Sequence, residues 1–393
     1  MSSDSVVIVA AQRTPIGAFQ GVLSEATAPE LGATAIKAAV ASSGLAVADV
    51  DQVLMGCVLP AGLGQAPARQ AALGAGIANG TACTTVNKMC GSGMATIMLA
   101  HDLLKAGSAT VVVAGGFESM SNAPFLLPKA RRGYRMGHQE VIDHMFYDGL
   151  QDPWKGLMMG HYADATAERY GFSRDDQDAF AVESVSRAQA AVAAGTFAAE
   201  IAPVTLKSRK GEIIIADDET PGAVSIDRIP TLRPAFNADG TVTAATSSSI
   251  SDGAAATVLM TEAEAQRRGI NPLARLVGHS SFAQEPAWFT TAPVSAIRRL
   301  QTTLDWTPSD VDLYEINEAF AVVTMAAMRD IGIEHSKVNV NGGACALGHP
   351  IGATGARITT TLLYALKARK LKRGIASLCI GGGEAVAIAV ELI

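Results

Sequence analysis

The feature that most constrains the fold is an alternation of short β-branched runs with longer alanine-rich stretches along the 393 residues. Runs at residues 6–9, 53–56 and 109–114 indicate strands, whereas residues 29–44 and 92–105 have the composition of helices. Such an alternation is typical of an α/β chain in which helices cover both faces of a sheet. We therefore expect an α/β fold.

The last third of the chain repeats this alternation. Residues 311–316 and 375–380 indicate strands, and residues 319–330 indicate a helix. Near the N-terminus, a turn carrying Cys90 leads through a helix to a strand that ends in two glycines. A turn carrying His349 leads through the same series near the C-terminus. The repetition predicts an internal duplication of one α/β unit.

Residues 121–249 differ in texture from the segments on either side. They hold a loop rich in arginine, methionine and glycine, a predicted helix at residues 175–194, and a turn-rich segment at residues 221–240. Long insertions in compact domains usually serve function. We therefore expect an inserted unit between the two halves.

Composition excludes several classes of protein. Apolar residues make up 49% of the chain, yet no apolar run approaches the roughly 20 residues that a membrane-spanning helix needs. The net charge of −6 argues against a general nucleic-acid binder, because neutralising phosphates takes a basic surface. A small anionic ligand remains compatible with a local basic patch. The first apolar run is too short for a signal peptide and has no basic region before it.

The cysteines indicate a reducing compartment. They are scattered, odd in number and never arranged as a CxxC pair, so neither a disulfide framework nor a zinc site is expected. We expect a cytoplasmic protein. The five positions are Cys57, Cys83, Cys90, Cys345 and Cys379.

Cys90 is the first candidate for chemistry. It lies between an extended segment and a helix, with Gly91 and Gly93 beside it. A thiol at this place is exposed to the positive end of the helix dipole and to free backbone N–H groups, which predicts a stabilised thiolate and so a nucleophile. The glycines allow substrate or other backbone to approach closely. The alternative is an inert buried cysteine.

His349 is the candidate partner of that thiol. It lies in the middle of residues 341–355, where five glycines and a proline impose an unusual backbone path. Histidine is the side chain best suited to take a thiol proton near neutral pH. The alternative is a histidine with a purely structural role.

Two further side chains follow predicted strands. Cys379 precedes Gly381, Gly382 and Gly383, and a cysteine at such a strand end can reach a ligand held by the glycine-rich loop. Asn317 follows residues 311–316. For Cys379 the alternative is a small apolar residue in a sheet, and for Asn317 it is a helix N-cap.

Together these segments resemble the active-site blocks of the thiolase family, in family order and at similar spacing. The blocks are the Cys90 segment, Asn317-Glu318-Ala319-Phe320, Gly342-Gly343 through Gly348-His349-Pro350, and Cys379-Ile380-Gly381-Gly382-Gly383. Further similarity runs from Arg13-Thr14-Pro15-Ile16-Gly17 through Gly115-Gly116-Phe117-Glu118-Ser119-Met120 and Leu232-Arg233-Pro234-Ala235-Phe236 to the C-terminus. The resemblance covers essentially the whole chain.

The resemblance implies a thiolase fold. Two similar βαβαβαββ halves would form a five-layered αβαβα core with a loop domain inserted between them. Residues 1–120 with 250–271 would form the N-terminal half, and residues 272–393 the C-terminal half. Residues 121–249 would form the loop domain, which binds CoA and joins subunits into a homotetramer, a dimer of dimers.

The resemblance also implies the chemistry. Cys90 would attack an acyl-CoA thioester while His349 takes its proton, and Cys379 would then remove a proton from Cα of a second acetyl-CoA. A water held by Asn317 would stabilise the enolate together with His349. The backbone N–H groups of Cys90 and Gly381 would hold the tetrahedral oxyanion. Ping-pong kinetics should follow. CoA thioesters are the substrates, and no metal or permanently bound cofactor is expected.

Within the family, the loop segments at residues 133–137 and 148–152 resemble the short-chain acetoacetyl-CoA type, which condenses two acetyl-CoA molecules reversibly. Three positions depart from that type. Met158-Met159-Gly160 replaces His-Met-Gly, Phe289-Thr290-Thr291-Ala292-Pro293 replaces Met-Gly-x-Gly-Pro, and Cys345 replaces an aliphatic residue. The first two departures alter the walls around the acyl and pantetheine groups.

The resemblance implies a set of side chains around the acyl-CoA. These are Leu150, Met158, Met159, Phe236, Ser248, Phe289 and Phe320. A basic cluster at Arg131, Arg132 and Arg135 either meets the CoA phosphates or belongs to a solvated or subunit-contact loop.

Three alternative functions stay open at this point. A 3-ketoacyl-CoA thiolase of β-oxidation would use the same residues on longer chains. A decarboxylating ketoacyl synthase has a related fold but lacks a second cysteine, so Cys379 argues against it. An inactive scaffold that merely binds acyl-CoA is disfavoured by the intact set of Cys90, Asn317, His349 and Cys379.

Overall fold

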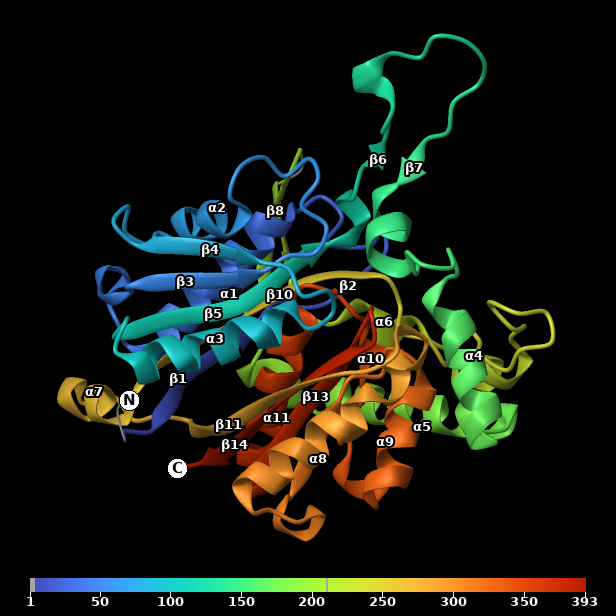
Figure 1. Cartoon of the computed structure of the whole chain (residues 1–393). Helices are drawn as coiled ribbons and strands as arrows, with labels where there is room; N and C mark the ends of the chain where they lie inside the picture. The colour runs from blue at the N-terminus through green and yellow to red at the C-terminus, as the bar shows by residue number, and fades with distance from the viewer. Residues whose placement is uncertain (1–3, 210) are drawn as a thin grey trace.

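The computed structural model describes residues 4–209 and 211–393, and their strands confirm the expected α/β class (Figure 1). The strands are β1 (Val6–Arg13), β2 (Gly17–Ala18), β3 (Gln52–Gly56), β4 (Ala82–Val86), β5 (Val111–Ser119), β6 (Phe125–Leu126), β7 (Ile142–Asp143), β8 (Val204–Ser208), β9 (Gly211–Ile215), β10 (Ser251–Thr261), β11 (Ala274–Ala283), β12 (Leu313–Ile316), β13 (Arg373–Ile380) and β14 (Glu384–Leu392). The helices are α1 (Ala28–Ser43), α2 (Pro67–Gly74), α3 (Ser92–Ala106), α4 (Met159–Tyr170), α5 (Arg174–Ala193), α6 (Glu219–Ala223), α7 (Glu262–Arg268), α8 (Ala292–Leu304), α9 (Ala321–Ile331), α10 (Ala344–Leu347) and α11 (Thr354–Arg369).

The sheet order shows the duplication directly. From one edge inwards, β4, β3 and β5 are parallel, and β10 and β1 follow antiparallel. The other half repeats this order, because Val338 forms a parallel bridge to β12, β12 and β13 are parallel, and β14 and β11 follow antiparallel. The halves join where β1 pairs briefly with β11, at Val7–Arg275 and Ile8–Ala274. The two predicted similar halves are therefore confirmed.

Helices cover both halves in layers. α1 and α2 pack on the outer face of the N-terminal strands, and α8 and α9 pack on the outer face of the C-terminal strands. α3 and α11 lie between the halves and share one apolar core with strands of both. Within the described residues the order of layers is αβαβα, as expected. Burial of this apolar surface is the main driving force for the arrangement.

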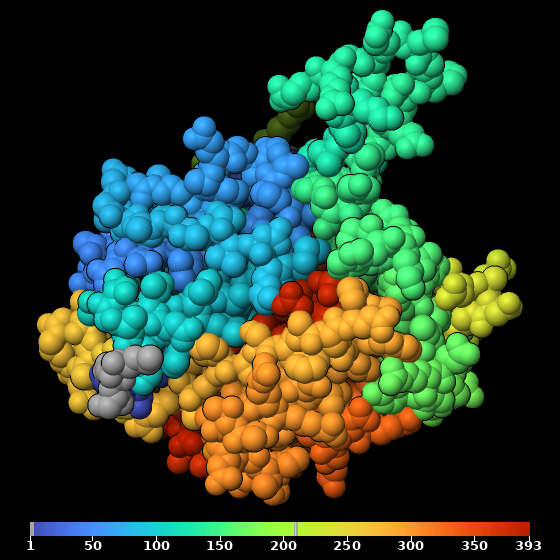
Figure 2. All heavy atoms as spheres, viewed as in Figure 1, coloured from blue at the N-terminus to red at the C-terminus, as the bar shows by residue number. Residues whose placement is uncertain are grey.

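The chain between β5 and β10 leaves the main sheet. Its strands form two separate two-stranded sheets, β6–β7 and β8–β9, and the helix predicted at residues 175–194 is α5, Arg174–Ala193. The segment between β6 and β7, residues 127–141, extends away from the body as an arm (Figures 1 and 2). The domain boundaries stay a prediction, and residues 1–3 of the first unit lie outside the described residues.

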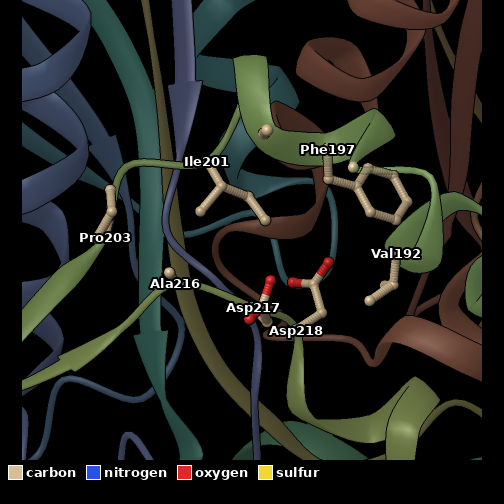
Figure 3. A pocket seen from close by; sticks show the side chains of 9 residues that line it. Val192, Phe197, Ile201, Pro203, Ala216, Asp217 and Asp218 are labelled. Atoms are coloured by element: carbon tan, nitrogen blue, oxygen red, sulfur yellow. The ribbon is translucent and has the colours of Figure 1, made fainter.

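A buried ion-pair cluster ties the inserted segment to β1. The guanidinium of Arg13 contacts a Glu200 carboxylate oxygen at 2.6 Å and an Asp218 carboxylate oxygen at 2.7 Å. Asp218 borders a hollow of about 250 Å³. Val192 and Phe197 line the same hollow (Figure 3). Because Asp218 is committed to Arg13, this hollow holds no free catalytic carboxylate from that residue. Breaking such a buried pair costs roughly 3–5 kcal/mol.

Two element boundaries differ from the predicted ones. The strand predicted at residues 109–114 is Val111–Ser119, because its glycine-containing end continues to pair with β10 rather than turning away. The helix predicted from residue 319 begins at Ala321, since Phe320 keeps an extended backbone as its N-cap. No helix among residues 4–209 and 211–393 is both long enough and apolar enough to cross a membrane.

Candidate active site

A cavity of about 400 Å³ opens where the two halves and the inserted segment meet. Every residue of the predicted site except Asn317 lines this cavity. Those residues are Cys90, Leu150, Met158, Met159, Phe236, Ser248, Phe289, Phe320, His349, Cys379 and Gly381. The N-terminal half contributes Cys90, and the C-terminal half contributes His349 and Cys379. Side chains more than 280 residues apart in sequence thus share one space.

Cys90 is presented by a tight turn between β4 and α3. Met89, directly before it, has a left-handed backbone with φ +47°, which is uncommon for a side chain of this kind. The Ser92 hydroxyl holds the turn, because it accepts from the Lys88 N–H at 2.9 Å and donates to the Met89 carbonyl at 2.6 Å. This turn directs the sulfur into the cavity.

Gly91 allows that turn to approach the end of β13. A Cβ at this position would lie 2.4 Å from Cδ1 of Ile380, the residue after Cys379. Real Cβ atoms do not tolerate such a contact, so glycine is required for the turn to reach the strand. The close packing brings the two cysteine-bearing segments together.

The electrostatics of Cys90 differ from the expected thiolate. The backbone N–H groups of Gly381, in the loop after β13, and of Cys90 itself lower the pKa of the thiol. Burial outweighs them and raises the pKa to about 11. The prediction of a stabilised thiolate in the unliganded protein is therefore wrong. The two N–H groups remain well placed for an anion that forms during reaction.

His349 is held as a neutral imidazole. Its Nδ1 lies 2.6 Å from the Thr354 hydroxyl, which donates its own proton to the Pro350 carbonyl at 2.9 Å. The hydroxyl therefore accepts from Nδ1–H, and this assignment leaves the lone pair on Nε2. Nε2 has no hydrogen-bond partner among the described residues. Burial, aided by the Arg357 charge, lowers the pKa of His349 to about 3.

Cys379 lies at the end of β13, where three glycines turn the chain into β14. Gly383 has φ +91°, and a Cβ there would lie 2.4 Å from the Gln284 carbonyl oxygen, so a side chain cannot be accommodated. Burial and the neighbouring Cys90 raise the pKa of the Cys379 thiol well above its usual range. Cys379 therefore rests as a thiol.

Asn317 is not among the residues that line the cavity. It is buried, and neither its Oδ1 nor its Nδ2 has a hydrogen-bond partner among the described residues. Its backbone N–H donates to the Ser377 carbonyl at 3.0 Å, which fixes it beside the strand that carries Cys379. The alternative that Asn317 caps the next helix is wrong, because Phe320 is the N-cap of α9.

Aromatic rings form one wall of the cavity. Phe320 packs edge-to-face against Phe236 with centroids 6.0 Å apart, and against Phe289 with centroids 6.4 Å apart. Gly160 makes room for this packing, since a Cβ there would lie 2.2 Å from the Phe236 ring. Phe289, one of the departures noted in the sequence, is thus part of a rigid wall.

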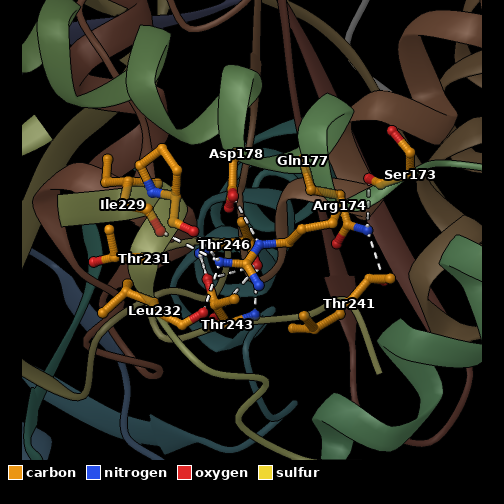
Figure 4. A network of polar contacts seen from close by, with 12 residues as sticks. Ser173, Arg174, Gln177, Asp178, Ile229, Thr231, Leu232, Thr241, Thr243 and Thr246 are labelled. Atoms are coloured by element: carbon orange, nitrogen blue, oxygen red, sulfur yellow. Dashed lines mark hydrogen bonds and ion pairs between the residues drawn. The ribbon is translucent and has the colours of Figure 1, made fainter. Parts of the chain in front are cut away.

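Polar contacts behind this wall fix the segment that carries Phe236 (Figure 4). Arg174 on α5 pairs with Asp178 at 2.7 Å and donates to the Leu232 carbonyl at 2.8 Å. The Gln177 amide donates to the Thr241 hydroxyl at 2.8 Å. These bonds hold residues 232–241 against α5, so the wall does not depend on apolar packing alone.

Glu118 is a positioning residue for which the sequence alone indicates no role. Its buried carboxylate accepts from the N–H groups of Val58 at 2.9 Å, Leu59 at 3.1 Å and Gly352 at 2.9 Å. Gly352 belongs to the loop that carries His349, so Glu118 positions that loop. Burial raises the pKa of Glu118 to about 7. Glu118 lies in the family-like segment 115–120, but its partners are distant in sequence and come together only in the fold.

A second hollow of about 410 Å³ adjoins the cavity and shares Met159 and Gly381 with it. Trp154 lines it and is 64% exposed. Gly149 lines both hollows as well, so they meet at Gly149, Met159 and Gly381.

Arg131, Arg132 and Arg135 lie on the exposed arm and do not line the cavity within one chain. The structure therefore does not bring them to the site, and both predicted roles stay open for them.

Known proteins resemble this chain over its full length. Residues 6–263 match the family described as "Thiolase, N-terminal domain", and residues 270–392 match "Thiolase, C-terminal domain". An acetyl-CoA acetyltransferase of Cupriavidus necator is 48% identical over 98% of this chain and 99% of that protein. A probable acetyl-CoA acetyltransferase of Dictyostelium discoideum is 46% identical over 99% of this chain and 94% of that protein.

A solved structure agrees. The crystal structure of the Bacillus anthracis acetyl-CoA acetyltransferase superimposes with a TM-score of 0.97, at 41% identity and 99% coverage of both chains. With its duplicated α/β core, its paired cysteines on one cavity and these full-length matches, the chain belongs to the thiolase family.

Proposed function

We propose that the chain is an acetyl-CoA C-acetyltransferase, which reversibly condenses two acetyl-CoA molecules to acetoacetyl-CoA and CoA. The observation that carries this proposal is the convergence of Cys90, neutral His349 and Cys379 on one cavity. A nucleophile and a separate base for a carbon acid are what a Claisen condensation needs. Acyl transfer alone would need only the first of them. The names of the relatives support the same activity.

The first half-reaction forms an acetyl-enzyme. The Cys90 sulfur attacks the thioester carbonyl, and its proton moves to the free Nε2 of His349. The N–H groups of Cys90 and Gly381 face the developing oxyanion, where such donors are worth roughly 3–4 kcal/mol each. When the tetrahedral intermediate collapses, CoA departs as a thiolate.

Cys379 becomes the base during that departure. It rests as a thiol because burial and Cys90 raise its pKa, so it must first lose a proton. The departing CoA thiolate is an acceptor that the reaction itself supplies. The resulting Cys379 thiolate removes a proton from Cα of the second acetyl-CoA, and the carbanion attacks the acetyl group on Cys90. The released Cys90 thiolate takes its proton back from His349.

The enolate oxygen needs donors at that stage. Protonated His349 supplies one. Asn317 is buried, its side-chain amide has no hydrogen-bond partner among the described residues, and it can orient a water as the second donor. Thioester α-protons are only weakly acidic, so the base succeeds only if such donors are already in position.

The cavity walls favour a short acyl group. Phe289 is buried and packs against Phe320 and Tyr162, with centroids 6.4 Å and 6.5 Å away, so it cannot move aside without disturbing these two rings. Met158 and Ile351 also line the cavity. This enclosure leaves an acetyl or acetoacetyl group as the best fit.

Initial rates of thiolysis separate the proposal from the β-oxidation alternative. Acetoacetyl-CoA should be cleaved with a kcat/KM at least tenfold above that for 3-ketodecanoyl-CoA. Phe289→Ala should lower the ratio of these two kcat/KM values, because removal of the ring makes room for the longer acyl chain. A wild-type preference for the longer chain would sink the short-chain assignment.

We further propose that CoA thioesters act only as substrates, with no cofactor held permanently, and that the protein works in the reducing cytoplasm. All five cysteines are free thiols. Two of them must stay reduced for the reaction above, which a glutathione-buffered compartment ensures.

A homotetramer is the proposed assembly. The arm and its base expose large apolar side chains, with Phe125 at 67%, Met136 at 92% and Val141 at 57% of their surface. Apolar groups gathered on an extended arm are typical of a protein–protein contact. We propose that the arms join two dimers.

A further inference from the structure

Two histidines and an aspartate from different halves meet on the surface. His101 and Asp102 lie in the last turns of α3, and His279 lies on β11. One Asp102 carboxylate oxygen is 2.9 Å from Nδ1 of His101 and 3.0 Å from Nε2 of His279. One ligand atom from each residue lies within 4.8 Å of the other two.

We propose that His101, Asp102 and His279 bind a divalent transition-metal cation of the zinc class, and that the cation clamps the two halves together. The predicted absence of a zinc site rested on cysteine spacing. The ligands proposed here are imidazoles and a carboxylate. Asp102 and His279 are 177 residues apart in sequence, so spacing could not indicate them.

The donor set fits that class of metal. Imidazole nitrogen and carboxylate oxygen bind zinc at about 2.0–2.2 Å, which places tetrahedral ligand atoms about 3.3 Å apart. Asp102 already lies within a few tenths of an ångström of that spacing from both rings. A single carboxylate leaves the bound cation with one positive charge and a position open to water or a further ligand. Harder cations such as Mg²⁺ prefer oxygen ligands and should bind poorly.

The histidines are held in place before any metal binds. Their side chains are only 14% and 20% exposed, and the rings pack edge-to-face with centroids 5.0 Å apart. Lys105 lies nearby, but its ammonium donates to the Asp4 carbonyl at 2.6 Å.

The site is remote from the reaction. About ten residues of α3 separate His101 from Cys90, which corresponds to about 15 Å along the helix. A cation here joins the helix that presents Cys90 to a strand of the other half. The consequence we expect is greater stability, because a ligand that binds only the folded chain stabilises it.

Cobalt titration of the full-length protein, stripped with a chelator, tests the proposal. Co²⁺ should bind one per chain and give visible d–d absorption without a thiolate-to-cobalt charge-transfer band, and Zn²⁺ should displace it. His279→Asn and His101→Asn should each weaken Co²⁺ binding by ~10–100-fold or more. His138→Asn, on the exposed arm, is the matched control and should bind as wild type.

Thermal unfolding supplies a second measurement. Zn²⁺ should raise the Tm of wild type and of His138→Asn, and it should leave the Tm of His279→Asn unchanged, with initial rates of all three proteins alike. A thiolate band on cobalt binding would place the metal at the cysteines and overturn the proposal. Undiminished cobalt affinity in both His→Asn variants would overturn it as well.

Discussion

At the scale of single residues, the reactive side chains Cys90, His349 and Cys379 are neutral in the unliganded site. Burial raises the pKa of Cys90 to about 11 and lowers the pKa of His349 to about 3. A permanent thiolate–imidazolium pair is thus disfavoured in the unliganded protein. The N–H groups of Cys90 and Gly381 contribute most when negative charge forms on the substrate.

The first prediction concerns pH. His349 gains a proton only when the pH falls through about 3, and Cys90 loses its proton only when the pH rises through about 11. The rate constant for acetylation should therefore be flat between about pH 5 and about pH 9. Single-turnover acetylation of Cys379→Ala by acetyl-CoA measures this step alone. An acetylation rate constant that rises between pH 6 and pH 7, in a step that disappears in His349→Asn, would show an ordinary pKa for His349 and contradict this prediction.

The second prediction concerns Asn317. Asn317→Ala should lower kcat for condensation by roughly 10²–10³-fold, because a preorganised donor to the enolate is lost. Acetylation of Cys90 should continue, since the N–H groups of Cys90 and Gly381, and not Asn317, hold the oxyanion of that step. Steady-state rates and acetyl labelling are compared on the same protein. Equal loss of both steps would indicate a structural role instead.

At the scale of elements, turns and loops position the chemistry. Glu118 on β5 holds the chain after β3 and the His349 loop through three backbone N–H groups. Met89 and Gly91 shape the turn before α3, and Gly383 shapes the turn after β13. Each reacting side chain is thus carried by a short segment whose path is fixed by specific contacts.

The third prediction concerns that carboxylate. Glu118→Ala leaves three buried N–H groups without an acceptor, at about 1–3 kcal/mol each. The variant should therefore lose at least about 3 kcal/mol of unfolding free energy and unfold at a lower temperature. Differential scanning calorimetry checks this. Glu212→Ala, on an exposed strand, serves as the control. Equal Tm values for the two variants would contradict the proposed role of Glu118 in holding the three N–H groups.

Sequence patterns predicted the positions of strands and helices better than they predicted the pKa shifts of the site residues. The runs at residues 6–9 and 375–380 marked true strands, because buried parallel and central strands are continuously apolar. The predicted strand ended at residue 114 because Gly115 and Gly116 indicate a turn, whereas β5 continues through them to Ser119. The sign of the Cys90 pKa shift was missed because burial depends on segments hundreds of residues away. The contact between Asp102 and His279 was not predicted either, because the two residues are 177 positions apart in sequence.

At the scale of the whole molecule, duplication explains why the site lies where it does. The Cys90 turn precedes α3 in one half, and the His349 loop precedes the equivalent central helix, α11, in the other. Because these two helices pack together between the sheets, their N-terminal loops meet. The inserted segment then encloses the meeting point with Phe236, Met158 and Met159.

The fourth prediction concerns assembly. Replacing residues 128–140 by a short Gly-Ser turn should halve the solution mass from that of four 40.5 kDa chains, while Cys90 still becomes acetylated. Size-exclusion chromatography with light scattering gives the mass. Ile214→Asp changes another exposed apolar residue, on β9, and should retain the wild-type mass. An unchanged mass after removal of the arm tip would place the contact elsewhere.

The most direct test of the account is to trap its intermediate. Cys379→Ala should react with radiolabelled acetyl-CoA to one acetyl group per chain and accumulate it, because the base for the second half-reaction is missing. Peptide mass spectrometry should place that acetyl group on Cys90, and Cys90→Ser/Cys379→Ala should carry none. Acetylation of another residue, or normal condensation by Cys379→Ala, would contradict the proposed mechanism.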